Sequence, residues 1–195
     1  IGLVYTTVSK NAFITAANVV IVPFIGFILY RRKLDKIGVI GSFMALLGIG
    51  VLSLEPDLSI NFGDFLTFLC AIAFAFHIFF TGEFSSKCNS YVLTVTQFSV
   101  AFILSFALQM ITGQTQLQSS PVGFMGALYL GVFSTAIGFL LQTICQSRVD
   151  QTKSAIILST ESVFGTIMSV IIFHEILTLR MVVGCIIIFA SIIIS

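Results

Sequence analysis

The chain has 195 residues, of which 57% are hydrophobic and only 9% are charged, and its mean hydropathy is +1.12. Soluble domains carry about 25% charged residues, so this composition excludes a water-soluble globular fold and makes lipid the solvent. The formal net charge of +1 argues against a nucleic-acid partner.

Long apolar runs alternate with short polar breaks along the whole chain. A helix needs about 20 residues to cross about 30 Å of hydrocarbon, and each run is close to that length. Helices are required because every backbone amide in lipid must find its partner within its own segment. We therefore predict an all-α transmembrane protein with about seven spans, at residues 11–30, 37–54, 63–81, 90–112, 121–144, 154–173 and 178–195.

Basic residues are concentrated on alternate loops between these spans. The opposite loops hold only Lys10 and Arg180. Because cytoplasmic loops carry an excess of lysine and arginine, the basic set is assigned to the cytoplasm and the C-terminus is expected there too. Seven of the nine lysines and arginines belong to this set: Arg31, Arg32, Lys33, Lys36, Lys87, Arg148 and Lys153.

Residues 10–41 are echoed by residues 153–184 without a gap, with eight of 32 positions identical, where composition alone would give about three. An odd number of predicted crossings separates the copies, so the second must be inverted in the bilayer. We expect residues 1–60 to be the C-terminal part of a first five-helix repeat and residues 61–195 to be a complete second one. The intact protein is then a ten-helix bundle, and such inverted repeats are typical of secondary transporters.

Two polar residues occupy matching positions in the repeat. Glu161 lies within span 154–173, where a carboxylate costs at least about 2.5 kcal/mol. Its repeat mate is Asn18, at matching depth from the opposite face, and Pro23 follows Asn18 by five residues and predicts a kink. A shared central site for a solute or proton is one interpretation. Two satisfied interhelical hydrogen bonds are the alternative.

Three further residues are candidates for a solute-binding site. His77 lies on a stripe of its span with Thr67, Cys70 and Phe74, where it could relay protons, touch a solute or simply pack. Gln142 is an uncharged polar residue in span 121–144, and Tyr5 is a further candidate near the first span. Small-residue pairs predict close helix approach at Gly41/Ala45, Ala71/Ala75 and Ser134/Gly138.

No motif of an enzyme is present. His174-Glu175 begins like a zinc-protease sequence, but Thr178 stands where the second histidine is needed. Neither a Walker A loop nor a serine-hydrolase elbow occurs, and we expect no metal and no cofactor. The remaining energy sources are gradients of the solute itself, of protons or of sodium.

The residues resemble the EamA domain of the drug/metabolite transporter superfamily. The first repeat is matched by Val4-Tyr-Thr-Thr, Pro23-Phe and Gly41, and the second by Thr160-Glu-Ser-Val-Phe-Gly, Glu175-Ile-Leu and Gly184. The resemblance implies ten spans in two inverted repeats, a central cavity, and export of amino acids or other small metabolites across the bacterial inner membrane.

From these observations we predict a multi-pass secondary transporter in the bacterial inner membrane, acting by alternating access. Its partners would be a small-molecule solute, membrane lipid and a candidate coupling proton. The predicted solute-binding residues are Asn18, Glu161, His77, Gln142 and Tyr5. A non-transporting membrane scaffold or sensor is the alternative, and it would have a sealed, dry bundle centre.

Overall fold

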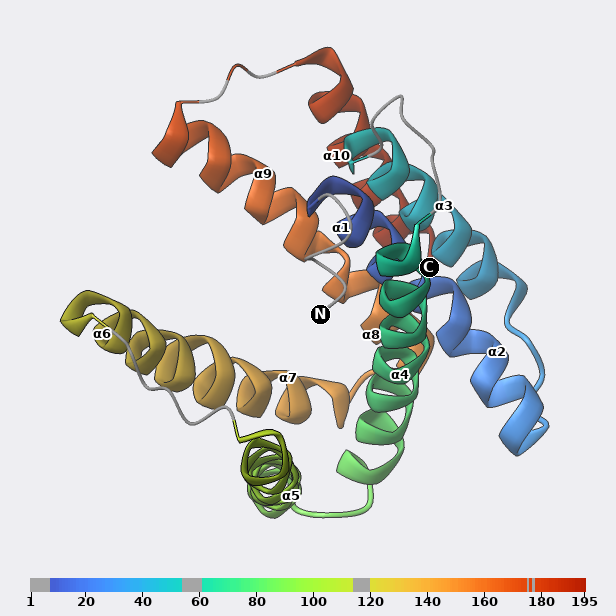
Figure 1. Cartoon of the computed structure of the whole chain (residues 1–195). Coiled ribbons are helices and arrows are strands. Elements are labelled where there is room, and N and C mark those ends of the chain that lie inside the picture. The colour runs from blue at the N-terminus through green and yellow to red at the C-terminus, as the bar shows by residue number, and fades with distance from the viewer. Residues whose placement is uncertain (1–7, 54–60, 114–119, 175, 177) are drawn as a thin grey trace. The chain divides into compact units, whose positions relative to one another are not determined.

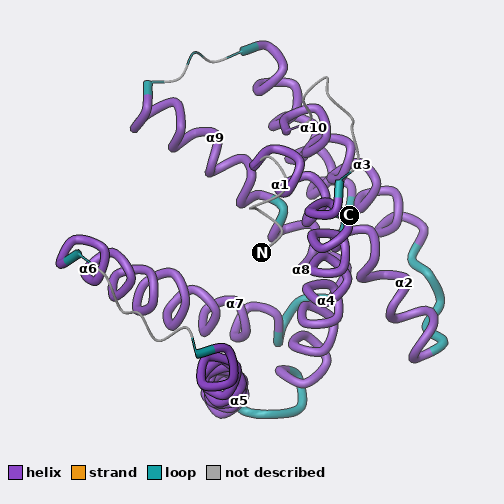
Figure 2. The backbone as a smooth tube through the Cα atoms, in the orientation of Figure 1, coloured by secondary structure: helices purple, strands orange, loops and turns teal. Residues whose placement is uncertain are grey.

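The computed structural model describes residues 8–53, 61–113, 120–174, 176 and 178–195. Helices account for nearly all regular structure in these ranges, and no strand occurs in them (Figures 1 and 2). The elements are α1 Val8–Ala16, α2 Asn18–Tyr30, α3 Lys36–Ser53, α4 Phe62–Ser85, α5 Ser90–Thr112, α6 Pro121–Tyr129, the π-helix η2 Leu130–Ile137, α7 Gly138–Gln146, α8 Gln151–Leu158, α9 Thr160–Phe173 and α10 Leu179–Ile194.

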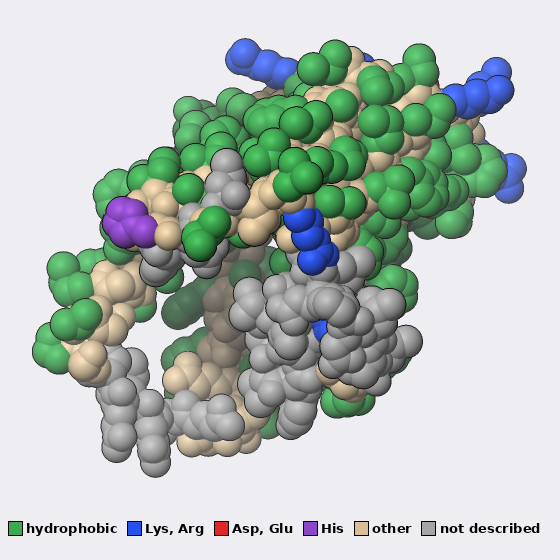
Figure 3. Space-filling model, turned by 90° about the horizontal axis from the view of Figure 1, so that it is seen from above, with side chains coloured by type: hydrophobic (Ala, Val, Ile, Leu, Met, Phe, Trp, Pro, Cys, Tyr) green, Lys and Arg blue, Asp and Glu red, His purple; other side chains and the backbone are tan. Residues whose placement is uncertain are grey.

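The predicted all-α transmembrane fold is confirmed. Two shorter apolar helices, Lys36–Leu52 and Leu179–Ile194, coincide with the remaining predicted spans. Hydrophobic side chains cover much of the described part of the face seen in Figure 3, where the basic side chains are few. Five segments are long and apolar enough to cross a membrane: Lys10–Tyr30, Phe62–Ser85, Ser90–Thr112, Pro121–Gln146 and Gln151–Ile172.

The chain divides into two compact units. Unit 1 comprises residues 1–80 and 150–195, and unit 2 comprises residues 81–149. Unit 1 thus brings α1, α2 and α3 together with α8, α9 and α10, which are the helices of the two sequence repeats. Unit 2 holds the end of α4 together with α5, α6, η2 and α7.

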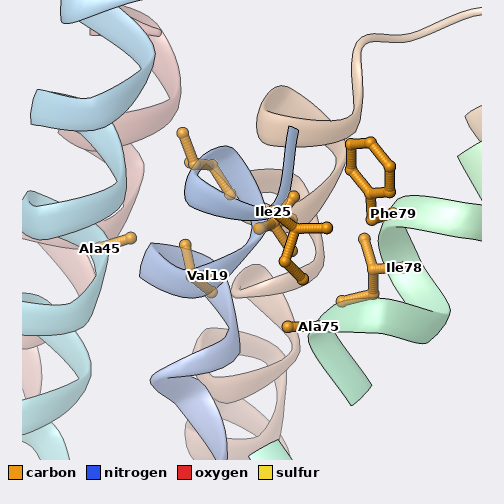
Figure 4. Close-up of a cluster of buried hydrophobic side chains, with 9 residues drawn as sticks. Val19, Ile25, Ala45, Ala75, Ile78 and Phe79 are labelled. Carbon is orange, nitrogen blue, oxygen red and sulfur yellow. The ribbon is translucent and has the colours of Figure 1, made fainter. Parts of the chain in front are cut away.

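A buried hydrophobic cluster joins α2, α3, α4 and α8 within unit 1 (Figure 4). Val22, Ile78 and Ile156 are completely buried in it, and Phe79 is 2% exposed. Two of the small residues that were predicted to allow close approach, Ala45 and Ala75, belong to this cluster, and Ala71 is also 0% exposed. By contrast, Ser134 and its neighbours in unit 2 are exposed, so that pair does not mark a buried helix contact.

The repeat extends to the backbone conformation of its helix ends. Arg31 (φ 50°) ends α2 and His174 (φ 54°) ends α9, both left-handed, and they are repeat mates at the 143-residue offset. They are the only non-glycine residues of positive φ in the ranges that the structure describes. The N–H groups of Arg31 and Arg32 both donate to the carbonyl of Gly26, which closes the end of α2.

Glycine at these two helix ends is expected to stabilise the protein. A left-handed residue with a β-carbon costs about 1 kcal/mol relative to glycine, so Arg31→Gly and His174→Gly should each raise the thermal unfolding midpoint in detergent. Arg31→Ala and His174→Ala are the matched controls, because they remove the same side chain and keep the β-carbon. If the glycine variants unfold no later than the alanine variants, the left-handed cap is not a source of strain.

Both copies break one long helix within one residue of the equivalent place. α1 gives way to α2 at Ala17, and α8 gives way to α9 at Ser159. Each break carries bonds of the i to i+3 type, from Val20 N–H to Ala17 O and from Ser162 N–H to Ser159 O, as in a short 3₁₀ turn. The break is separate from Pro23, because it precedes the proline by six residues and recurs in a copy with Thr166 at the proline's position. The kink expected at Pro23, within α2, stays a prediction.

α3 and α10 are repeat mates, and they pack against each other in opposite directions. Gly41 lies beside the carbonyl of Ser191, and Gly48 lies beside the carbonyl of Gly184. Nearer the end of α3, the Nε–H of Arg180 donates to the carbonyl of Val51. The position along α10 falls as the position along α3 rises, so the two helices are antiparallel.

The contacts across this pair are reciprocal. At the 143-residue offset, Gly184 is the mate of Gly41 and Ser191 is the mate of Gly48. Each glycine of one helix therefore contacts the mate of the other, which is the pattern of an interface around a two-fold axis. The prediction of an inverted repeat is confirmed for these helices.

Candidate functional site

The two polar mates of the repeat each lie just after a helix break. Asn18 is the first residue of α2 and is 6% exposed. Glu161 is the second residue of α9 and is exposed. An acidic residue in the first turn of a helix interacts favourably with the helix dipole, so part of the cost of placing a carboxylate in an apolar span is offset locally.

A small apolar cluster brings the two breaks into one neighbourhood of unit 1. Val163, two residues after Glu161, is buried with Ile49 and Ile188, and Phe13 and Ala16 of α1 pack on this cluster. Both helices pack on α8, but α2 also packs on α3, whereas α9 also packs on α10. Asn18 and Glu161 are therefore held in place by helices that differ in part.

His77 is half-buried on α4, in the part of the helix that belongs to unit 1. Its ring stacks on that of Phe74, with centroids 6.0 Å apart and planes 4° from parallel. The helix turn that follows supplies Ile78 and Phe79 to the buried cluster. The packing interpretation of His77 therefore has a direct contact to support it, and its role toward a solute stays a prediction.

The contacts of a polar cluster at the start of α4 were not predicted, although Asp64 does lie in the first turn of the helix. Thr67 is 3% exposed and donates its hydroxyl proton to Oδ1 of Asn11, at 2.9 Å. Asn61 and Asp64 bond reciprocally, each backbone N–H donating to the other's side chain at 3.0 Å, which is a capping-box arrangement. The spacing Asn-x-x-Asp could have indicated the capping box from sequence. The bond between Thr67 and Asn11 could not have been predicted in this way, because the two residues lie far apart in sequence.

Lys10 belongs to the same end of unit 1, immediately before Asn11. It is 7% exposed, whereas its repeat mate Lys153 is exposed. A buried charged group needs partners, whereas an exposed one does not. The two lysines therefore lie in different environments although they occupy the same position of the repeat. Sequence identity at this position could not have shown that difference, because it depends on which helices cover each end of the repeat.

In unit 2, the sequence candidate Gln142 lies on α7, where it is half-buried. One turn later, Gln146 ends the helix and is 4% exposed. The segment before α7 is the π-helix η2, whose end is marked by the bond from Gly138 N–H to Phe133 O. Such π segments are frequent at functional sites, and sequence patterning predicted an uninterrupted α-helix here.

The remaining sequence candidates lie outside the described residues. Tyr5 precedes the first described residue, and Glu175, which carries part of the family resemblance, falls in a gap. Their roles stay predictions.

An all-helical bundle of membrane-spanning length, with repeat-mate helices packed antiparallel, defines a multi-pass membrane protein of the inverted-repeat class. Comparison with known proteins gives the family: residues 61–195 match the EamA-like transporter family, and the chain belongs to it. The resemblance found in the sequence is thereby confirmed.

Relatives in this family extend beyond the chain. An uncharacterized transporter of Archaeoglobus fulgidus is 32% identical over 194 residues, which are 100% of this chain and 62% of that protein. The uncharacterized transporter YetK of Bacillus subtilis is 24% identical over 182 residues, covering 89% of this chain and 55% of that protein. The chain thus spans little more than half to about two thirds of such relatives.

A solved crystal structure shares the fold. It superposes with a TM-score of 0.80 at 17% sequence identity, covering 99% of this chain and 70% of that chain. At this identity the likeness concerns the fold alone.

Proposed function

We propose that the intact protein is a secondary transporter that exports a small metabolite, such as an amino acid, across the bacterial inner membrane by alternating access. Residues 1–60 would belong to its first five-helix repeat and residues 61–195 to its second, with the C-terminus in the cytoplasm. A proton is the candidate coupling ion. The coarser statement, a membrane transporter, follows from the family and from relatives named as transporters.

One observation carries the proposal of a solute site. Glu161 is exposed near the middle of the apolar segment Gln151–Ile172. A carboxylate that faced lipid at this depth would cost about 2.5 to 3.5 kcal/mol. Its exposed surface is therefore expected to border water or a solute, and the buried amide of its mate Asn18 supports a second polar position after the equivalent break.

Removing these groups should slow transport. In proteoliposomes containing the intact protein, we expect Glu161→Gln and Asn18→Ala each to lower the initial rate of amino-acid flux about tenfold, because each loses one hydrogen bond to the solute. Glu161→Gln also removes the carboxylate that would carry a coupling proton. The control is Phe164→Leu, an exposed apolar position on α9. Full flux and unchanged solute affinity in both variants would refute the assignment of the site.

The scaffold or sensor alternative is tested by access to water. Cysteine is placed at Asn18 or Glu161 in a background lacking Cys70, Cys88, Cys145 and Cys185, of which the first three are exposed. A carrier should allow a membrane-impermeant thiol reagent to label Glu161→Cys, and added solute should slow the reaction. Absence of labelling at both positions would favour a sealed bundle and argue against transport.

A further inference from the structure

Two glutamines on one stripe of α7 have amide atoms without partners. Gln146 is 4% exposed, and among the residues that the structure describes neither its Nε2 nor its Oε1 has a hydrogen-bond partner. The same holds for Nε2 of Gln142, one helical turn earlier. Residues four apart lie on the same helix face, so both carboxamides belong to a single stripe.

Buried polar groups are normally paired, and an unpaired amide destabilises the fold that contains it. A leucine at Gln146 would fill similar space without that penalty. A nearly buried carboxamide with both atoms unpaired is therefore a feature that folding alone does not explain. It is explained when another molecule supplies the missing hydrogen bonds.

Neighbouring polar side chains of unit 2 are already paired. Thr143 is 1% exposed and donates to the carbonyl of Phe139, at 2.8 Å. On α5, the Nε2 of Gln97 donates to Oγ1 of Thr81, at 3.1 Å, while the adjacent Phe98 packs edge-on against Phe139. The hydrogen-bonding capacity left open on this part of α7 is that of the two glutamines.

The chemistry of the stripe favours an uncharged ligand group. A carboxamide offers one acceptor and one donor group and carries no charge. Glu83, a buried carboxylate of the same unit, already forms an ion pair with Lys87. A charged ligand group would need a counter-charge on burial, whereas a hydroxyl or a carboxamide can both donate to Oε1 and accept from Nε2.

We propose that Gln146, with Gln142 one turn away, forms a specificity subsite for an uncharged hydroxyl or carboxamide group of the transported solute. This rests on the proposed transport function. It names a residue, Gln146, that the sequence candidates did not include, and it predicts which solutes the protein prefers.

The first test measures stability. Gln146→Leu removes a buried amide that has no partner among the residues that the structure describes, so the thermal unfolding midpoint of the intact protein in detergent should rise or stay unchanged. A clear fall in the midpoint would show that the amide is bonded within the fold, and it would overturn the subsite. Gln109→Leu, an exposed glutamine on α5, is the control for the general effect of adding an apolar side chain.

The second test measures specificity with two matched pairs of radiolabelled amino acids in proteoliposomes. L-serine differs from L-alanine by a hydroxyl, and L-asparagine differs from the similarly sized L-leucine by its carboxamide. Wild-type protein should move the polar member of a pair about tenfold faster, because one hydrogen bond is worth about that factor. Gln146→Leu should abolish the preference, Gln142→Leu should weaken it, and Gln109→Leu should keep it.

The outcomes separate the subsite from the transport function. Flux without any preference in wild type, or a preference that survives Gln146→Leu, would overturn the subsite while transport stands. If wild type moves none of the four amino acids, the proposal that the exported metabolite is an amino acid of this kind fails. The subsite is then decided by thermal unfolding, in which added L-asparagine must raise the midpoint of wild type and leave that of Gln146→Leu unchanged.

Discussion

Valine in place of Gly48 or Gly184 is expected to give the largest loss of stability in unit 1. A β-carbon at Gly48 would lie 2.8 Å from Cγ1 of Ile188, and one at Gly184 would lie 2.9 Å from the carbonyl oxygen of Gly48. Because the second obstacle is backbone, α3 and α10 must separate. Overpacking of this kind costs about 3 kcal/mol, which corresponds to a fall of about 10 °C in the unfolding midpoint.

The matched control for both variants is Gly165→Val on α9. Gly165 is also helical, but nothing lies within 4 Å of the β-carbon that it would gain, so only the change in helix propensity acts there. Midpoints are measured by size-exclusion chromatography of heated, detergent-solubilised protein. Equal midpoints for Gly48→Val and Gly165→Val would contradict the close antiparallel crossing.

The contact between the two glycines leads to a further prediction about the double variant Gly48→Val/Gly184→Val. Gly48 and Gly184 contact each other, so their effects should not add. Once one valine has separated the helices, the second has less contact left to disrupt. A double variant whose midpoint falls by the full sum of the two single effects would show that the glycines act at independent places.

Truncating Phe79 to alanine is expected to give the next largest loss of stability. Phe79 is 2% exposed in the cluster of α2, α3, α4 and α8, and its ring lies 5.5 Å from that of Tyr30. In water such a change costs about 3 to 5 kcal/mol. In a bilayer we expect about 2 to 3 kcal/mol, because lipid is as apolar as the core and only the cavity and the lost contacts remain.

Phe68→Ala is the control for Phe79→Ala, since Phe68 lies on the same helix and is 45% exposed. A compensating pair tests the contact directly. A β-carbon at Gly26 would lie 3.2 Å from Cε2 of Phe79, so Gly26→Ala should destabilise the wild type and be tolerated better beside Phe79→Leu. If the two phenylalanine variants unfold alike, the cluster does not hold α4 in unit 1.

Sequence patterning was most reliable where lipid imposes a simple rule. The span predicted at 90–112 became α5 at Ser90–Thr112, because apolar length and hydrogen-bonding need leave few alternatives in a bilayer. The span predicted at 121–144 was placed correctly but became three elements, α6, η2 and α7. Hydrophobicity does not distinguish an α-turn from a π-turn.

For the candidate site residues, the sequence pattern identified polar side chains inside predicted spans, but it did not show which of them are buried. Gln142 was selected as a polar residue within the predicted span 121–144, whereas Gln146 lies beyond the end of that span and was not considered. Burial reverses their order, with Gln146 4% exposed and Gln142 half-buried. Burial is a property of neighbouring helices, and one helix's sequence does not contain it.

The sequence by itself determined that this protein is helical and apolar enough to cross a membrane several times, and it predicted an inverted repeat, since composition, run length and self-similarity are local or directly countable. Only the tertiary structure decided that Gly48 meets Gly184, that each copy breaks just before its polar mate, and that Lys10 is buried where Lys153 is exposed. Those features arise from contacts between distant segments. Such contacts depend on how side chains pack together in three dimensions. They cannot be read from a sequence in which many apolar residues are interchangeable.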